Sequence, residues 1–181
     1  DDMTAPSDIR VQLLTESASS LVITRPPSLQ PNDQRFWVTL GTARDFYGES
    51  KLFLTAEDEV GNVVSQTIVV IVQPRNDPPT LEPIANIFVP RGATATTVLL
   101  TGISTGAANE ADLLVVSAVA EVPLTETGLT VQYESPAAIG RLVLPPWSEQ
   151  HASLQTVVAV RVGDGDAEIT RQFRVEYEAQ P

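Results

Sequence analysis

Apolar and polar residues alternate along most of this 181-residue chain, and a period of two predicts β-strands. The first part contains five strand candidates, residues 9–13, 21–23, 36–40, 51–55 and 66–72. The second part contains seven, residues 86–89, 97–100, 113–119, 129–133, 141–144, 156–162 and 170–177. Gly, Pro and Asn separate the candidates at the short spacing typical of a β-sandwich. No sustained helical pattern occurs, although residues 121–127 have room for a single turn.

The two parts of the chain are related in sequence. A constant offset of 105 residues places Ile9 on Leu114 and Val70 on Val175, and the similarity spans most of both parts. We therefore predict two copies of one module, residues 1–78 and 79–181, joined at Asn76-Asp77. The counterpart of residues 79–105 is missing from the first copy. We expect that module to be incomplete, part of a longer repeat protein, with its vacant place filled by an upstream segment or a neighbouring chain.

The last strand of each copy predicts which side chains form the core. Alternation places three side chains of each strand on the inward face: Ile68, Val70 and Val72 in the first copy, and Phe173, Val175 and Tyr177 in the second. Val69 and Ile71 make the opposite face of the first strand apolar as well. Either another module covers that face or the strand faces the other way.

Residues 57–62 and 163–166 occupy corresponding places before these last strands. Both contain Gly, which adopts positive φ, and Asp, which bonds its own backbone, so both predict hairpin turns. Asp164 and Asp166 also suggest a metal or acid–base pair, but an exposed turn favours the turn role. Pro78 and Pro79 fix the backbone after Asp77, which predicts a short, stiff connection.

Composition excludes several classes of function. The net charge of −12 and the pI near 4.3 argue against nucleic-acid binding, which needs a basic surface. Without cysteine there is no disulfide and no thiolate chemistry. No apolar run approaches the roughly 20 residues that span a bilayer, so we expect no direct membrane insertion. We interpret His151, the single histidine, as a surface residue. Nothing is assembled for catalysis, so we predict that the chain is not an enzyme.

A resemblance rests on Asp45-Phe46-Tyr47-Gly48, on residues 52–56 and on Asn76-Asp77-Pro78-Pro79. Together these stretches resemble cadherin-like tandem repeats of large surface and adhesion proteins. The resemblance implies an all-β fold of antiparallel, Ig-like β-sandwich modules, a role in cell adhesion and an extracellular or cell-surface location.

In that family the joint between repeats binds calcium, and the resemblance implies a Ca²⁺ site at Asn76, Asp77, Asn109, Glu110 and Asp112. Calcium prefers six to eight carboxylate, carbonyl and water oxygens, which these residues would supply in part. Arg91 departs from the family pattern, and a pairing of Arg91 with Asp77 would replace the cation. The alternative is an acidic turn stiffened by proline, and both interpretations stay open.

The sequence thus favours a non-catalytic structural or adhesive spacer in a larger extracellular repeat protein. Its expected partners are neighbouring repeats of the same chain or other surface proteins. One alternative is a carbohydrate-binding module, in which Trp37 or Trp147 would join Tyr47 on an exposed face to contact glycans. Another alternative is a scaffold in an extracellular filament, where neighbouring subunits cover unpaired edge strands.

Overall fold

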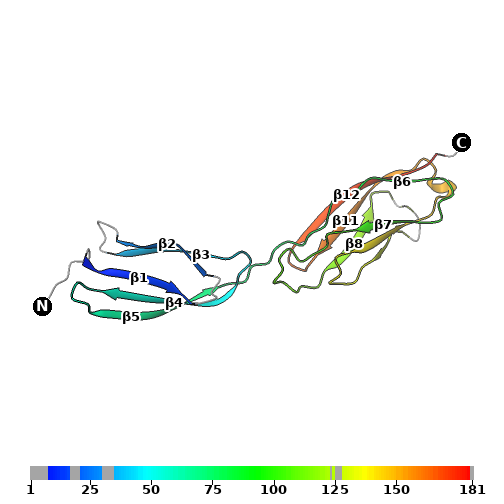
Figure 1. Cartoon of the computed structure of the whole chain (residues 1–181). Helices are drawn as coiled ribbons and strands as arrows, with labels where there is room; N and C mark the ends of the chain where they lie inside the picture. The colour runs from blue at the N-terminus through cyan, green and yellow to red at the C-terminus, as the bar shows by residue number, and fades with distance from the viewer. Residues whose placement is uncertain (1–7, 17–20, 30–34, 123, 125–127, 180–181) are drawn as a thin grey trace. The chain divides into compact units, whose positions relative to one another are not determined.

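The computed structural model describes residues 8–16, 21–29, 35–122, 124 and 128–179. The chain is nearly all β and divides into two compact units, Asp1–Arg75 and Asn76–Pro181, which we call module 1 and module 2 (Figure 1). Each module is an Ig-like β-sandwich of two sheets, as the alternating pattern predicts. Asn76 and Asp77 make their side-chain and backbone hydrogen bonds within module 2, to Asp164 and Glu110.

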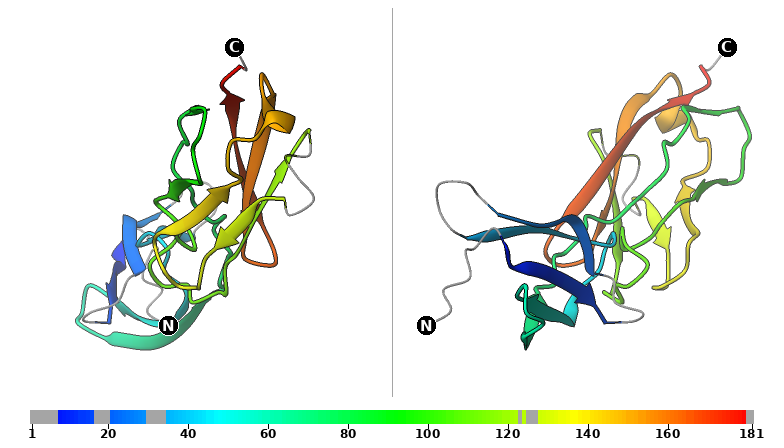
Figure 2. Two further views of the ribbon diagram at one scale, coloured as in Figure 1. Left: turned by 90° about the vertical axis from the view of Figure 1, so that its right-hand side faces the viewer. Right: turned by 60° about the vertical axis from the view of Figure 1, so that its left-hand side comes forward.

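Module 2 contains seven strands in the described residues: β6 (Ile87–Val89), β7 (Thr96–Leu100), β8 (Val115–Ala120), β9 (Thr130–Gln132), β10 (Gly140–Leu144), β11 (Gln155–Gly163) and β12 (Glu168–Tyr177). One sheet has the order β6-β12-β11-β8 and the other β7-β10-β9. The long β11–β12 hairpin runs from orange to red in Figure 2. The pairing of β6 with β12 is parallel, whereas the other pairings are antiparallel.

The core of module 2 lies between its two sheets. Of the described residues, fifteen with apolar side chains are buried there, including Val158, Val160 and Val162 from β11. Phe173, Val175 and Tyr177 from β12 join them, which confirms the inward face predicted for that strand. Alternate burial along both strands is the consequence of side chains pointing to opposite faces of a pleated sheet.

Module 1 contains five strands in the described residues: β1 (Arg10–Thr15), β2 (Leu21–Leu29), β3 (Phe36–Thr42), β4 (Gly48–Glu57) and β5 (Val63–Val72). They form a sheet of order β1-β4-β5 and a two-stranded sheet of β2 and β3. β2 continues through Pro26 and Pro27, where its register with β3 shifts. Proline is tolerated there because it lies on an edge strand at a bulge.

The core of module 1 is small. Among the described residues, only Leu13 and Leu52 are buried in it, and five partly buried residues pack on them: Ile23, Leu40, Leu54, Val70 and Val72. Val69 and Ile71 are 50% and 66% exposed. The inward face predicted for β5 is therefore confirmed at Val70 and Val72, whereas Ile68 is 37% exposed. The opposite face, with Val69 and Ile71, is also exposed.

The two modules follow the internal repeat strand by strand. β1 corresponds to β8 and β5 to β12 at the offset of 105, but β4 corresponds to β11 with one residue more, because Leu13 pairs with Leu54 whereas Ala118 pairs with Val160. Both predicted hairpins form, since β4 pairs with β5 and β11 with β12. The single helical turn expected at residues 121–127 lies mostly outside the described residues.

Candidate functional site

The candidate site begins at the segment that enters module 2. Pro79 is fully buried, and the Thr80 N–H donates to the carbonyl of Ser104 at 2.9 Å. The Thr80 hydroxyl donates to the Gly102 carbonyl at 2.6 Å. Because proline restricts the backbone on one side and these bonds fix it on the other, the segment is part of module 2 rather than a free linker.

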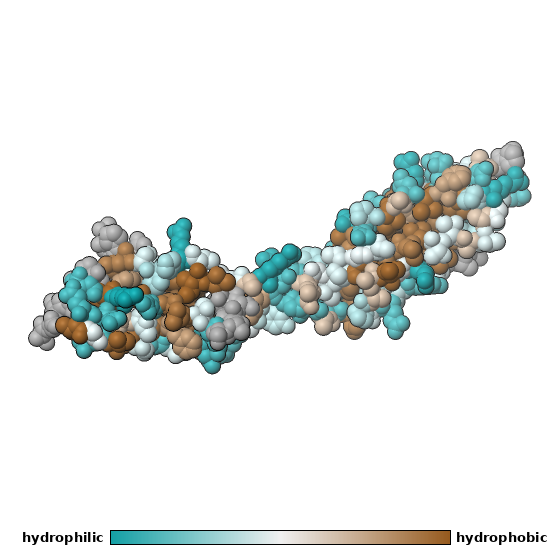
Figure 3. Space-filling view, in the orientation of Figure 1, coloured by the Kyte–Doolittle hydropathy of each residue, from teal (hydrophilic) through white to brown (hydrophobic). Residues whose placement is uncertain are grey.

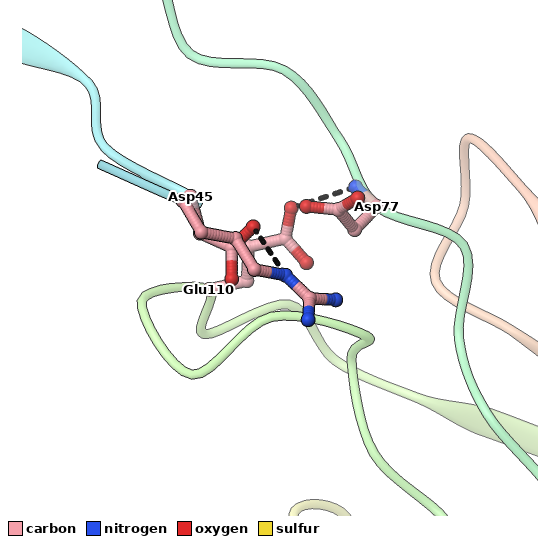
Figure 4. A network of polar contacts seen from close by, with 4 residues as sticks. Asp45, Asp77 and Glu110 are labelled. Atoms are coloured by element: carbon pink, nitrogen blue, oxygen red, sulfur yellow. Dashed lines mark hydrogen bonds and ion pairs between the residues drawn. The ribbon is translucent and has the colours of Figure 1, made fainter. Parts of the chain in front are cut away.

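Glu110 holds the backbone of this segment at Asp77 (Figure 4). The Asp77 N–H donates to Glu110 Oε1 at 2.8 Å, a charge-assisted hydrogen bond. The loop that carries Glu110 approaches closely at Gly106, whose φ is +103°. A Cβ built there would lie 2.4 Å from the Pro78 carbonyl oxygen. Glycine is required because any side chain would push the loop away from the segment.

Asn76 is fixed by a second contact, to the hairpin between β11 and β12. Its side-chain amide donates to Asp164 Oδ2 at 3.1 Å. The same carboxylate accepts hydrogen bonds from the N–H groups of Ala167, at 2.7 Å, and Asp166, at 2.8 Å. The bond from Ala167, followed by that from Asn76, holds the pKa of Asp164 below its usual value. Asp164 therefore organises a turn and anchors the joint, which favours the turn role over an acid–base pair.

Asp58 organises the corresponding turn of module 1. Its carboxylate accepts the side-chain amide of Asn62 at 2.8 Å and the N–H groups of Asn62 and Val60. These bonds, the Asn62 side chain foremost, lower the pKa of Asp58. The two hairpins thus use one device, an Asp that bonds the backbone ahead of it.

The structure brings together two of the five residues predicted to bind calcium. Asp77 and Glu110 are in contact through the Asp77 backbone, while Asn76 bonds Asp164. Asn109 and Asp112 are exposed on the same loop as Glu110. Among the described residues, no group of three or more His, Asp or Glu side chains is placed to hold a metal ion.

One observation at Glu110 is unexplained by the turn alone. Its second carboxylate oxygen, Oε2, is buried and has no hydrogen-bond partner. A buried oxygen of this kind is costly unless a donor, a water molecule or a cation satisfies it. The chemistry of this atom fits a hard cation, although the surrounding carboxylates do not form a complete ligand set.

Arg91 lies away from Asp77, so the predicted replacement of the cation by Arg91 is wrong. The Arg91 guanidinium lies 5.6 Å from the centre of the Trp147 ring. The Arg91 N–H donates to Glu178 Oε2 at 2.7 Å, and Trp147 Nε1 donates to the Glu178 carbonyl at 2.9 Å. The positive charge of the guanidinium is attracted to the face of the aromatic ring, so this contact is favourable for both side chains. Trp147 is partly buried against the module 2 core, which leaves it little surface for a glycan.

The other aromatic candidates are exposed. Trp37 on β3 is 56% exposed and Tyr47 is 48% exposed. Exposed aromatic rings bind sugars and protein partners alike. Exposure alone therefore does not select the carbohydrate-binding alternative.

The surface role expected for His151 is wrong, because this side chain is only 4% exposed. It lies in a short 3₁₀ helix, Glu149–His151, where Nδ1 is 3.2 Å from the Pro146 carbonyl and 3.0 Å from Ser148 Oγ. Its ring lies 5.1 Å from that of Tyr177. Because a carbonyl only accepts, the bond to Pro146 requires a protonated Nδ1. His151 thus closes one end of the core.

Comparisons with known proteins agree with this fold. No protein-family model matches the sequence, and no curated protein matches it at a significant level. Solved structures do match, among them protocadherin gammaB7 repeats 3 to 6, with 12% identity and a TM-score of 0.55. The ectodomain of human desmocollin-1 matches with 15% identity and a TM-score of 0.51. The titin domains Z1Z2 in complex with telethonin match with 11% identity and a TM-score of 0.46.

The two cadherin matches, whose TM-scores are above 0.5, agree with the class of the fold. They cover 94% of this chain for both cadherin structures, but only 40% and 35% of those longer chains. At identities this low they establish architecture alone. The chain has the fold of tandem cadherin-like, Ig-like repeat modules. The described residues include no helix with the length and apolar character required to cross a bilayer.

Proposed function

We propose that this chain is a non-catalytic structural or adhesive spacer segment of a larger extracellular repeat protein. The observation that carries the proposal is the anchoring of the joint. β5 ends at Val72, and the chain is already bonded to module 2 at Asn76 and Asp77. Three residues, 73–75, connect the last strand of module 1 to the first anchored residue, and one of them is proline.

A linker this short and restricted limits how far adjacent modules move independently. A spacer must keep adjacent repeats at a defined separation, and a short, restricted linker serves this purpose. The fold shared with cadherin and protocadherin ectodomains supports the same role and an extracellular location. The partners proposed on this basis are neighbouring repeats and other surface proteins, including those of an extracellular scaffold.

The spacer proposal is tested by measuring whether the modules tumble together. ¹⁵N relaxation of the full chain should give one set of anisotropic tumbling parameters for both modules. A variant with Gly-Ser-Gly-Ser inserted between Pro74 and Arg75 should give separate, faster tumbling for each module. If the unmodified chain already behaves like the insertion variant, the joint is not stiff and the proposal fails.

Calcium binding at the joint is a second candidate function, favoured by the buried and unpartnered Glu110 Oε2. We propose that this oxygen and the Asp77 side chain bind Ca²⁺, with Asn76, Asn109 and Asp112 as the remaining predicted ligands. A ligand present at 100 times its Kd stabilises the native state by about 2.7 kcal/mol. Bound calcium would therefore raise the melting temperature of module 2.

The experiment compares Ca²⁺ titrations of the unmodified chain, Glu110→Gln and the control Glu149→Gln. Glutamine keeps an oxygen that accepts the Asp77 N–H but removes the charge. We expect a calorimetric signal and a rise in melting temperature for the unmodified chain and the control, and neither for Glu110→Gln. Absence of heat with the unmodified chain removes the calcium proposal and leaves the spacer proposal intact.

A further inference from the structure

β8 lies at one end of the four-stranded sheet of module 2, and among the described residues no strand pairs with its outer side (Figure 1). The other ends of the two sheets are protected. β6 and β9 have only three residues each, and the chain runs beside the end of β7, where the Glu82 N–H donates to the Thr101 carbonyl at 2.9 Å. β8 has six residues, Val-Val-Ser-Ala-Val-Ala, without a charge, a proline or a glycine. It therefore lacks the features that normally prevent an edge strand from pairing with another chain.

The hydrogen bonds of β8 show which of its backbone groups face the open side. Glu121, directly after the strand, donates its N–H to the Val157 carbonyl at 2.9 Å. Opposite residues of an antiparallel ladder alternate between pairs that bond each other and pairs that do not. Every second residue back from Glu121 therefore bonds β11. The N–H and carbonyl groups of the intervening residues, Val116, Ala118 and Ala120, point to the open side.

The outer face beside this edge carries an exposed apolar residue and two charges. Val119 is 57% exposed, and Figure 3 shows that apolar residues, in brown, reach the surface of module 2. Arg161 on β11 is exposed and lies opposite Ser117 of β8. Glu121 is exposed two residues beyond Val119. Among the described residues, neither Arg161 nor Glu121 forms a salt bridge.

We propose that module 2 pairs with a second copy of this chain through β8, antiparallel and about a two-fold axis at Val119. In this register, Ala118 and Ala120 of one copy exchange main-chain hydrogen bonds with Ala120 and Ala118 of the other. The two four-stranded sheets then form one sheet of eight strands. The two Val119 side chains contact each other on its outer face. A two-fold interface repeats every contact, so the surface has to complement itself.

The charges select a second copy as the occupant of this edge. Glu121 of the second copy lies opposite Ser117, and Arg161 lies on the other side of Ser117. Opposite residues of adjacent strands have Cα atoms about 4.5–5.5 Å apart, so the Cα atoms of Arg161 and Glu121 are about 10 Å apart. Their two long side chains meet over the small side chain of Ser117. The salt bridge forms twice, and β8 itself has no charge that would repel its copy despite the net charge of −12.

This interface is small, because one pair of strands buries less than the roughly 800 Å² per partner of a stable complex. We therefore expect a weak dimer, half formed at a concentration on the order of 100 µM. The inference goes beyond the spacer proposal, since it concerns contact between separate chains. In a protein with several such modules, weak contacts of this kind would add along the chain.

The experiment is sedimentation equilibrium of the full chain from about 10 µM to about 1 mM, a range that brackets the expected dissociation constant. The molar mass should rise toward twice that of the monomer. Val119→Lys should remain a monomer, because it places two positive charges side by side at the axis. Leu99→Lys is the matched control: Leu99 is also 57% exposed but lies on the other sheet. It should dimerise as the unmodified chain does.

A charge exchange tests the register. Arg161→Glu and Glu121→Arg should each weaken the dimer about tenfold, because each removes two salt bridges and brings like charges together. The double variant should restore the affinity, since it forms the same pairs with reversed sign. Amide exchange at Ala118 and Ala120 should also slow as the concentration of the unmodified chain rises.

Three results would overturn the inference. One is a monomeric mass up to about 1 mM, which leaves the β8 edge to a different polypeptide. Another is an equal loss of dimer in Val119→Lys and Leu99→Lys, which places the contact on another surface. The third is a double charge variant as weak as the single ones. Tumbling of the two modules in Val119→Lys, which we expect to be monomeric, tests the spacer proposal separately.

Discussion

Replacement of Gly106 by alanine tests how the joint is held to module 2. Two effects act at this residue. Its φ of +103° is unfavourable for any residue with a Cβ, and that Cβ would lie 2.4 Å from the Pro78 carbonyl oxygen. The backbone atom cannot rotate away as a flexible side chain would. The loop must therefore shift and carry Glu110 away from the Asp77 N–H.

Gly165 provides a matched control for the first effect. Its φ is +104°, and nothing lies within 4 Å of the Cβ that alanine would add. Gly165→Ala should cost only the backbone strain, about 1–2 kcal/mol. Gly106→Ala should cost that strain and, in addition, most of the charge-assisted bond to Asp77, about 1.5–3 kcal/mol. We expect a total loss of about 3–5 kcal/mol in the stability of module 2.

The assay is urea unfolding of the full chain, followed through NMR signals assigned to each module, with amide exchange measured at Asp77 and Thr80. After correction for the difference in global stability between the two variants, these two amides should exchange faster in Gly106→Ala than in Gly165→Ala. The module 1 transition should not move in either variant. Equal losses in the two variants, or unchanged exchange at Asp77, would show that the close approach of the loop does not fix the joint.

Three further predictions concern the core and the titrating groups. Val70→Ala should destabilise module 1 by about 1–3 kcal/mol in urea unfolding, while Val69→Ala on the exposed face should cost less than about 0.5 kcal/mol. Burial raises the pKa of Tyr177 to about 12, above its unfolded value of 10.0. Module 2 should therefore keep this contribution below pH 10 and lose it, on the order of 1–2 kcal/mol, as the pH rises through 12. The pKa of Asp164 is lowered from 3.8 in the folded state, so the ionised carboxylate stabilises the hairpin at pH values above 3.8. This contribution should be lost as the pH falls below 3.8. In Asp164→Asn, amide exchange at Ala167 should not show this acid dependence.

Each of these predictions has an outcome that contradicts it. Equal losses in Val70→Ala and Val69→Ala mean that β5 faces the other way. Tyr177→Phe, which removes the hydroxyl that donates to Pro145 at 3.0 Å, should abolish the alkaline loss, and persistence of that loss assigns it to another group. An unchanged acid profile in Asp164→Asn means that another carboxylate anchors the turn.

The sequence by itself determined the local features of this protein. Alternation predicted the twelve strands, the inward face of β12 and the inward positions of Val70 and Val72 on β5, because side-chain direction in a strand depends on position along it. The Asp and Gly residues of the two hairpins predicted their turns, since Asp accepts hydrogen bonds from the backbone a few residues ahead and Gly adopts positive φ without strain. The sequence also predicted two related copies, residues 1–78 and 79–181, whereas the compact units of the structure divide after Arg75.

At the candidate site, the sequence identified Asp77 and Glu110 but not the way in which they meet. Glu110 accepts the backbone N–H of Asp77, and Asn76 bonds Asp164, a residue 88 positions away. No pattern in the sequence links Asn76 with Asp164, because their proximity depends on the return of the β11–β12 hairpin to the start of the module. The sequence pattern does not single out Gly106, because the close approach of Pro78 to it is set by the fold.

The tertiary structure alone decided the remaining points. The parallel pairing of β6 with β12, the burial of His151 and the stacking of Arg91 on Trp147 each depend on where distant strands lie. Strand direction, burial of a polar side chain and choice of a ring partner are set by non-local packing. A lone histidine in a polar stretch predicts a surface position, and only the fold, which places the Tyr177 ring beside His151, shows that it is buried.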